Sequence, residues 1–241
     1  MSGGDPLRRE AVCDIMDVTD LVVTTRNRPA YLQRTLGHIW DRTKTPYRLT
    51  VVDDGSLEVD DLLCCWRRGL IQNLVLKGMQ QGAMAALNVG TWASFSDPVV
   101  FCDDDVLCPQ LEPDWMARGL EEMNRHGELA MLALRHPGAK VKPYDRAGNV
   151  VYCKSLGGTF CFVRRRFLEE NPLPHKHGNL AKPMEERCRM AHAGGWKIGF
   201  LSGVYCQHIG EDSVLTGEKY KGRFIEPIDP LTLEPPAKYA D

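Results

Sequence analysis

The chain has 241 residues, a formal net charge of −2 and 43% hydrophobic residues. This composition excludes a disordered chain and provides enough apolar residues for one large domain or two small ones. The near-zero charge argues against a surface that binds phosphate over its whole area, although a local basic patch remains compatible with it.

The first half of the chain alternates short β-rich runs with amphipathic stretches, which is typical of a parallel sheet flanked by helices. Pro29 stands where the first turn of a helix tolerates a missing N–H, and apolar residues recur behind it at helical spacing. We predict strands over 21–24, 47–52, 71–76 and 98–102, with helices that begin at Pro29 and near residue 59 and a third over 81–95.

The second half changes character after one more helix and strand. Pro, Gly and Asn between polar runs predict a hairpin or loop over 137–156. The remaining predicted elements are helices over 113–126 and 184–193, a short helix that ends near Pro172, and strands over 129–134, 158–163, 196–201 and 204–208.

Nine cysteines are present, and none forms the Cys-x-x-Cys pair that builds structural zinc sites. Several lie in apolar runs, so we expect reduced thiols that pack in the core. No apolar run reaches the ~18 residues of a membrane helix, and the N-terminus is polar. We therefore expect a cytoplasmic protein without integral membrane association.

Three consecutive aspartates, Asp103, Asp104 and Asp105, follow an apolar predicted strand. In an open α/β sheet, ligands bind beyond the carboxyl ends of the strands. Adjacent carboxylates repel one another unless a cation or several N–H donors neutralise them, and their oxygens suit magnesium or manganese. We interpret the triplet as a metal site; a loop with an Asx turn and a helix cap is the alternative.

Polar residues also follow the first two strands, at 24–27 and 53–56. Each group alone is an ordinary strand-to-helix turn. Because the carboxyl ends of neighbouring parallel strands meet at one rim, the three groups together outline one site. Hydroxyl and carboxylate acceptors there can pair with a pyrimidine base and with ribose, while a metal bridges a diphosphate.

These segments resemble the nucleotide-sugar-dependent glycosyltransferases of the GT-A fold, especially the family 2 type. The similarity lies in residues 20–29, 51–56, 81–90 and 103–105 and extends over roughly 20–208. It implies an α/β, Rossmann-like, mostly parallel sheet flanked by helices, with a smaller acceptor-side subregion. We expect an N-terminal segment (1–18), a single catalytic domain (19–208, with a nucleotide-binding half over 19–110 and an acceptor half over 111–208) and a C-terminal tail (209–241), whose position makes it a candidate lid over the site.

The resemblance also assigns roles on the donor side. It implies a nucleobase contact by Thr24 and Asp54 with Arg26 nearby, a ribose contact by Asp103, and a principal metal ligand in Asp105, assisted by Asp104. A bound manganese or magnesium ion would stabilise the departing nucleoside diphosphate without any proton transfer. His208, at the end of the last predicted strand, matches a histidine that completes the metal sphere; a satisfied polar residue is the alternative.

On the acceptor side, residues 157–160 resemble the small-residue strand that forms the floor of the sugar pocket. Glu185 and Glu186 match an acidic pair that supplies the catalytic base in inverting members, and we favour Glu186. Alternatively, the negative charge of either glutamate stabilises the start of a helix through the helix macrodipole. The pair is Glu-Glu where Glu-Asp is the commonest pattern, which leaves inversion or retention open.

The leading hypothesis is therefore a metal-dependent glycosyltransferase that uses a nucleotide-sugar donor, expected to be UDP-linked, and is inverting. The hydroxyl acceptor is a small molecule, a glycan, a protein or a modified nucleic acid base. For a nucleic acid, the expected footprint comprises Lys140, Lys142, Arg164, Arg165, Arg166, Lys219 and Lys221. The alternatives are a catalytically silent binding module and a nucleotidyltransferase, although the latter's glycine-rich phosphate loop is missing from residues 24–29.

Overall fold

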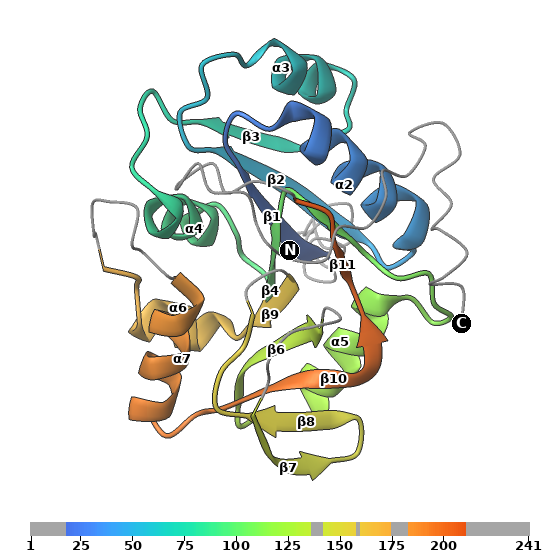
Figure 1. Cartoon of the computed structure of the whole chain (residues 1–241), viewed down its shortest axis with the longest axis vertical. Coiled ribbons are helices and arrows are strands. Elements are labelled where there is room, and N and C mark those ends of the chain that lie inside the picture. Colours follow the sequence, from blue (N-terminus) through green and yellow to red (C-terminus); the bar gives the residue numbers. More distant parts are fainter. Residues whose placement is uncertain (1–17, 136–141, 158–159, 175–182, 211–241) are drawn as a thin grey trace, which may run out of the picture.

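The protein is an α/β fold in which helices cover both faces of one twisted sheet (Figure 1). The computed structural model describes residues 18–135, 142–157, 160–174 and 183–210. Across the sheet the strands are β3 (Asn73–Leu76), β2 (Tyr47–Asp53), β1 (Thr19–Thr25), β4 (Val99–Asp103), β9 (Phe160–Val163), β6 (Leu129–Arg135), β10 (Lys197–Tyr205), β8 (Val150–Cys153) and β7 (Pro143–Ala147). Strands β8 and β9 run against the others, so the predicted mostly parallel sheet is confirmed.

The two faces of the sheet bury separate apolar cores. Leu21 and Val23 point from β1 towards one layer of helices, and Val22 points towards the other, as expected from the two-residue alternation of a strand. The first layer contains α2 (Pro29–Arg42), α3 (Asp60–Arg67) and α5 (Trp115–Arg125). The second contains α4 (Ala83–Trp92), α6 (Arg165–Glu170) and α7 (Pro183–Ala193).

The sheet contains a topological switch point between β1 and β4. The chain places β2 and β3 successively on one side of β1 and then crosses over to place β4 on the other side. Thr24 is in register with Asp103 of β4, and Thr25 with Asp53 of β2. Ligands of open α/β sheets bind outside the carboxyl ends of the strands at such a point, so the fold itself selects this rim.

Several predicted boundaries change in the structure. The helix predicted over 81–95 spans only 83–92, and the strand predicted over 71–76 begins at Asn73. The predicted division into strands over 196–201 and 204–208 is wrong. A single strand, β10, runs through residues 197–205 with an irregular register. The short strand β11 (Gln207–His208) then pairs antiparallel with β5 (Val106–Leu107), immediately after the aspartate triplet.

Other predictions are confirmed or fall outside the description. The hairpin expected within 137–156 is formed by β7 and β8. The described cysteines form no disulfide bond with one another and are buried, except for the exposed Cys64. Among the described residues, no helix is both long and apolar enough to span a bilayer. The predicted N-terminal segment up to residue 17, the tail from residue 211, and residues 140, 158 and 159 lie outside the described residues.

Candidate functional site

The carboxyl ends of β1, β2 and β4 bring three of the predicted polar groups to one rim. Thr24 is half-buried and lies beside Asp103 in the register of β1 and β4. The backbone N–H of Asp54 donates to the carbonyl oxygen of Thr25 at 2.9 Å. The turns that follow β1 and β2 are also joined, because the N–H of Asn27 donates to Ser56 Oγ at 2.8 Å. The strand ends predicted to form one site therefore do meet.

The turn after β2 is held by Asp53. Its Oδ2 accepts the backbone N–H groups of Gly55 and Ser56, and its Oδ1 accepts the hydroxyl of Ser56. Gly55 has φ +78°, and a Cβ there would lie 2.6 Å from the backbone of Met79 and Gln80. Glycine therefore allows the loop after β3 to pack directly on this turn.

Asp54 joins the same two segments from the other side. Its Oδ1 accepts from Lys77 Nζ at 2.5 Å and from the N–H of Gln81 at 3.0 Å. Its Oδ2 accepts from the N–H of Gly82 at 2.8 Å. The Asp54 and Lys77 side chains are both only 8% exposed. This carboxylate, predicted to contact a nucleobase, thus serves as a clamp between β2 and the start of α4.

The middle aspartate of the triplet is anchored to the body of the protein. Asp104 Oδ2 accepts from Thr25 Oγ1 at 2.6 Å, and Oδ1 pairs with Arg28 Nη1 at 3.0 Å. The Asp104 carbonyl oxygen accepts from Thr35 Oγ1 of α2 at 2.8 Å. Burial raises the pKa of Asp104 to about 6, although Arg28 and Thr25 oppose this effect.

Asp105 lies between two cationic or potentially cationic groups. Its Oδ2 is 2.6 Å from Arg28 Nη2, and its buried Oδ1 is 3.2 Å from His208 Nε2. Burial opposes ionisation, but His208 and Arg28 outweigh it, so the pKa of Asp105 lies below its ordinary value. Burial also acts to lower the pKa of His208, yet the nearby Asp105 and Asp103 carboxylates raise it.

Asp103 completes the rim beside Thr24. Burial raises the pKa of Asp103 to about 8, and the negative charges of Asp105 and Asp104 add to this shift. The surroundings of Asp103 therefore favour its neutral form over its ionised form. The triplet thus contains three carboxyl groups in three electrostatic environments, and one of them, Asp103, would ionise readily only beside further positive charge.

The residues around Asp105 fit a divalent cation in their chemistry. A carboxylate suits magnesium or manganese, imidazole is a common metal ligand, and Asp105 and His208 present these two groups side by side. Within the described ranges, no group of three or more His, Cys, Asp or Glu side chains is arranged to hold an ion. An ion held by this pair would need further ligands from a substrate or from water.

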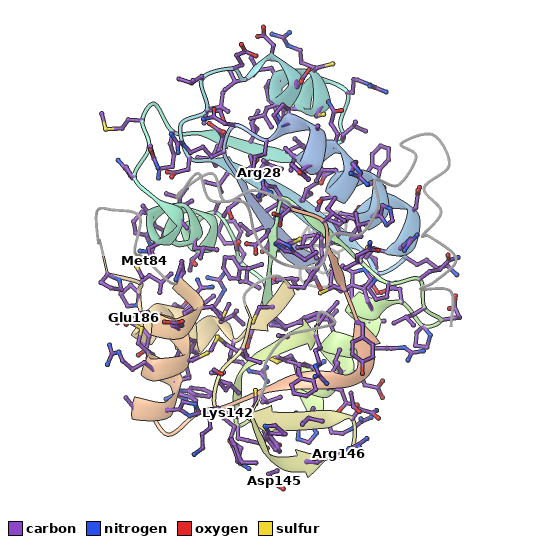
Figure 2. All side chains as sticks on the ribbon, in the orientation of Figure 1. Arg28, Met84, Lys142, Asp145, Arg146 and Glu186 are labelled. Carbon is purple, nitrogen blue, oxygen red and sulfur yellow. The ribbon has the colours of Figure 1, made fainter. Side chains whose placement is uncertain are left out.

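The predicted acceptor residues lie on a different element. Glu185 and Glu186 occupy the first turn of α7, which packs on β10. Glu185 is exposed, whereas Glu186 is half-buried and pairs with Arg189 at 2.7 Å. Figure 2 shows Glu186 on α7 and Arg28 at the other layer of the fold, beside the start of α2.

The three consecutive arginines have internal partners. Arg164 donates to the carbonyl oxygen of Met123, and Arg165 donates through Nε to that of Ser96 at 3.0 Å. Arg166 pairs with Glu170 along α6 at 2.7 Å. These contacts favour a structural role at the start of α6 over a footprint for nucleic acid. Arg26, predicted near the nucleobase, is half-buried at the turn after β1.

Sequence reasoning missed Arg28, Thr25, Thr35 and Lys77. Arg28 carries a recognisable signal, because it immediately precedes Pro29 at the start of a predicted helix and follows a strand of the same rim. Lys77 carries a weaker one, at the end of the third strand. The partners of Thr25 and Thr35 depend on how the loop after β4 packs on α2, which no local pattern specifies.

Comparisons with known proteins identify the relatives of this arrangement. Residues 20–196 match the family described as Glycosyl transferase family 2. Among curated proteins, none matches the sequence. Similar solved structures include Staphylococcus aureus TarS 1-349 in complex with UDP-GlcNAc, with a TM-score of 0.65 and 15% identity over 84% of this chain and 61% of that one.

Two further structures show the same fold. The mannosyltransferase PcManGT from Pyrobaculum calidifontis, in complex with GDP-Man and Mn²⁺, has a TM-score of 0.62 and 18% identity over 80% of this chain and 57% of that one. GalNAc-T7 with UDP, GalNAc and Mn²⁺ has a TM-score of 0.64 and 13% identity over 90% of this chain and 46% of that one. The chain thus spans roughly half the length of these proteins.

Proposed function

The chain belongs to glycosyl transferase family 2, and from this premise we propose that it transfers a sugar from a nucleoside diphosphate sugar to a hydroxyl acceptor. One observation carries the proposal. Asp105 and His208 come from distant parts of the sequence and meet beside the rim at the carboxyl ends of β1 and β4. That rim is where an open α/β sheet binds its ligands, and its polar groups suit a nucleotide.

We propose a UDP-linked donor and a divalent cation, manganese or magnesium. TarS was crystallised with UDP-GlcNAc, and GalNAc-T7 with UDP, GalNAc and Mn²⁺. PcManGT was crystallised with GDP-Man and Mn²⁺. Thr24, Arg26 and Asp54 would surround the base and Asp103 the ribose, with Asp105 and His208 holding the ion. When bound, the ion would stabilise the negative charge of the departing diphosphate.

On the acceptor side, we propose that Glu186 is the base of an inverting transfer. A carboxylate that accepts the acceptor's hydroxyl proton must be ionised and within hydrogen-bond reach of that hydroxyl. Its pairing with Arg189 at 2.7 Å orients the carboxylate, and its half-buried position leaves it accessible. The exposed Glu185 is the second candidate. Residues 19–110 would then bind the donor and residues 111–208 the acceptor.

A thermal-shift screen tests the donor and the ion together. We expect UDP-sugars plus Mn²⁺ to raise the melting temperature more than GDP-sugars plus Mn²⁺ or either component alone, because ligands that bind the native state stabilise it. Asp105→Asn should abolish the shift. Asp97→Asn makes the same charge change just before β4, at the opposite end of this strand from the rim, where Asp97 accepts from the backbone N–H of Arg165, and should retain the shift. No shift with any nucleotide sugar would contradict the proposal.

Product analysis tests the reaction. Release of free nucleoside diphosphate in the presence of an acceptor supports glycosyl transfer, whereas release of pyrophosphate indicates a nucleotidyltransferase. Glu186→Gln should lower kcat by roughly 10²–10⁴-fold at unchanged donor affinity, as expected for a general base, and Glu185→Gln is the matched variant. Retention of the anomeric configuration in the product, followed by NMR, would contradict the inverting mechanism.

A further inference from the structure

Arg28 gives the acidic rim a cation of its own. Its guanidinium spans two carboxylates, with Nη1 3.0 Å from Asp104 Oδ1 and Nη2 2.6 Å from Asp105 Oδ2. The guanidinium carbon lies 4.5 Å from the centre of the Tyr31 ring, so the group is also held by an aromatic face. The Arg28 side chain is only 15% exposed. Figure 2 labels it beside the turn between β1 and α2.

The chain after β10 encloses the same carboxylate from the other side. Pairing of β11 with β5 places His208 against Asp105, and the N–H of Ile209 donates to the Asp105 carbonyl oxygen at 2.8 Å. Gly210 follows so closely that a Cβ there would overlap both Asp105 Oδ2 and Arg28 Nη2. As a result, the side chain of Asp105 is only 5% exposed.

This enclosure has an electrostatic consequence for a divalent cation. An ion at the Asp105 carboxylate would displace Arg28 Nη2 or share the carboxylate with it, and two positive charges in a buried site repel strongly. If a metal ion alone displaced Arg28 from Asp105, the guanidinium would keep only Asp104 as a carboxylate partner. An entering diphosphate changes this balance, because its oxygens accept the planar fork of an arginine in the same way as a carboxylate.

Asp104 does not need the guanidinium to remain satisfied. Thr25 Oγ1 donates to its other oxygen at 2.6 Å, and Thr35 holds its backbone. Arg28 can therefore turn from Asp105 towards a phosphate without leaving Asp104 as a buried carboxylate that lacks a donor. The exchange also conserves charge around Arg28, since one anion replaces another.

We propose that Arg28 is a positioning residue that occupies Asp105 until the donor diphosphate takes over its guanidinium, so that the divalent cation and the nucleotide bind together. The inference rests on the proposed function for its nucleotide half. Its metal half concerns only the competition between Arg28 and a cation at Asp105 and His208, and is testable without any nucleotide.

Binding of Mn²⁺ to the full chain, followed by the EPR signal of the free ion, tests the metal half. Without nucleotide, Arg28→Met should bind Mn²⁺ at least tenfold more tightly than the wild type, because the competing cation is gone. Arg166→Met removes an equal charge from an exposed arginine on α6 and should bind as the wild type does. Adding Asp105→Asn to Arg28→Met should cancel the gain. Equal Mn²⁺ affinity of Arg28→Met and wild type would overturn the inference.

Arg28→Gln provides a second route to the same test. Its uncharged amide keeps a hydrogen-bond donor beside the carboxylates while removing the competing charge, so we expect tighter Mn²⁺ binding without nucleotide at unchanged secondary structure by circular dichroism. Addition of UDP should strengthen Mn²⁺ binding at least tenfold in the wild type and much less in Arg28→Met. Tighter Mn²⁺ binding by both variants with no effect of any nucleotide would support the metal half and contradict the proposed function. Equal Mn²⁺ affinity of Arg28→Gln and wild type would contradict the inference.

Discussion

Replacement of Asp54 by alanine tests whether this carboxylate acts as a clamp between β2 and the loop before α4. The substitution removes the acceptor of a buried ammonium and of two backbone N–H groups, those of Gln81 and Gly82. Loss of one partner of a buried ion pair typically destabilises a protein by about 3–5 kcal/mol. We expect about 3 kcal/mol, because Gln81 is exposed and its amide can bind water instead.

The partner variant separates the charge from the backbone contacts. Lys77→Met removes the buried ammonium and leaves Asp54 with two N–H donors, so it should lower the free energy of unfolding by only about 1 kcal/mol. The free energy of unfolding of the double variant should exceed the value expected for additive effects by about 1 kcal/mol or more, because no unpaired buried charge remains. Urea unfolding at neutral pH measures all four proteins.

Two results would refute this reasoning. An Asp54→Ala variant within about 0.5 kcal/mol of the wild type would show that the carboxylate does not stabilise the loop. Strict additivity in the double variant would show that Lys77 and Asp54 do not interact. Lys77→Met breaks the ion pair but keeps the carboxylate, whereas Asp54→Ala removes both. Donor binding that is lost in Asp54→Ala and retained in Lys77→Met would therefore support the proposed contact between Asp54 and the nucleobase.

Three further predictions concern stability. Burial and two neighbouring arginines lower the pKa of His38 to about 4 in the native state. As the pH falls, the unfolded chain therefore binds this proton first, near pH 6.5, and the native state binds it only near pH 4. Stability should therefore fall by about 3 kcal/mol from pH 7 to below pH 4, and urea unfolding of His38→Gln should lack this component. Asp114→Ala removes the N-cap of α5 and the contacts with residues 44 and 45, and should lower the free energy of urea unfolding by about 2–3 kcal/mol. An unchanged free energy of unfolding would show that α5 does not need this cap. Thr25→Val should destabilise by about 1–3 kcal/mol through the donor lost to Asp104, and an unchanged urea midpoint would contradict that contact.

The parallel half of the fold was predictable because its signals are local. Short apolar strands, Pro29 at the start of a helix and polar residues after each strand place β1, β2 and β4 and their rim. The position of β9 was not predictable, since it inserts antiparallel between β4 and β6 and nothing in its four residues specifies those partners. The split of the final strand into β10 and β11 likewise depends on β5, a two-residue partner far away in sequence.

The site was predictable in its residue types but not in its pairings. The rim residues Thr24 and Asp103 and the pair of Asp105 and His208 come together as the sequence predicted. Whether these residues contact a donor and a metal stays a prediction. Arg28 escaped notice because arginines before helices are common, and only the folded geometry shows that its two nitrogens span Asp104 and Asp105.

The unequal roles within the aspartate triplet follow from chain geometry. Three consecutive residues that leave a strand cannot all direct their side chains to the same side, so the middle one must find other partners. Thr25 and Arg28 supply these partners for Asp104, which fixes the loop to β1 and α2. The negative charges of Asp105 and Asp104 oppose the ionisation of Asp103, whose pKa they help to raise. Ionised Asp103 would need positive charge beyond Arg28 and His208, and this is the physical reason to propose a metal ion when the donor diphosphate is bound.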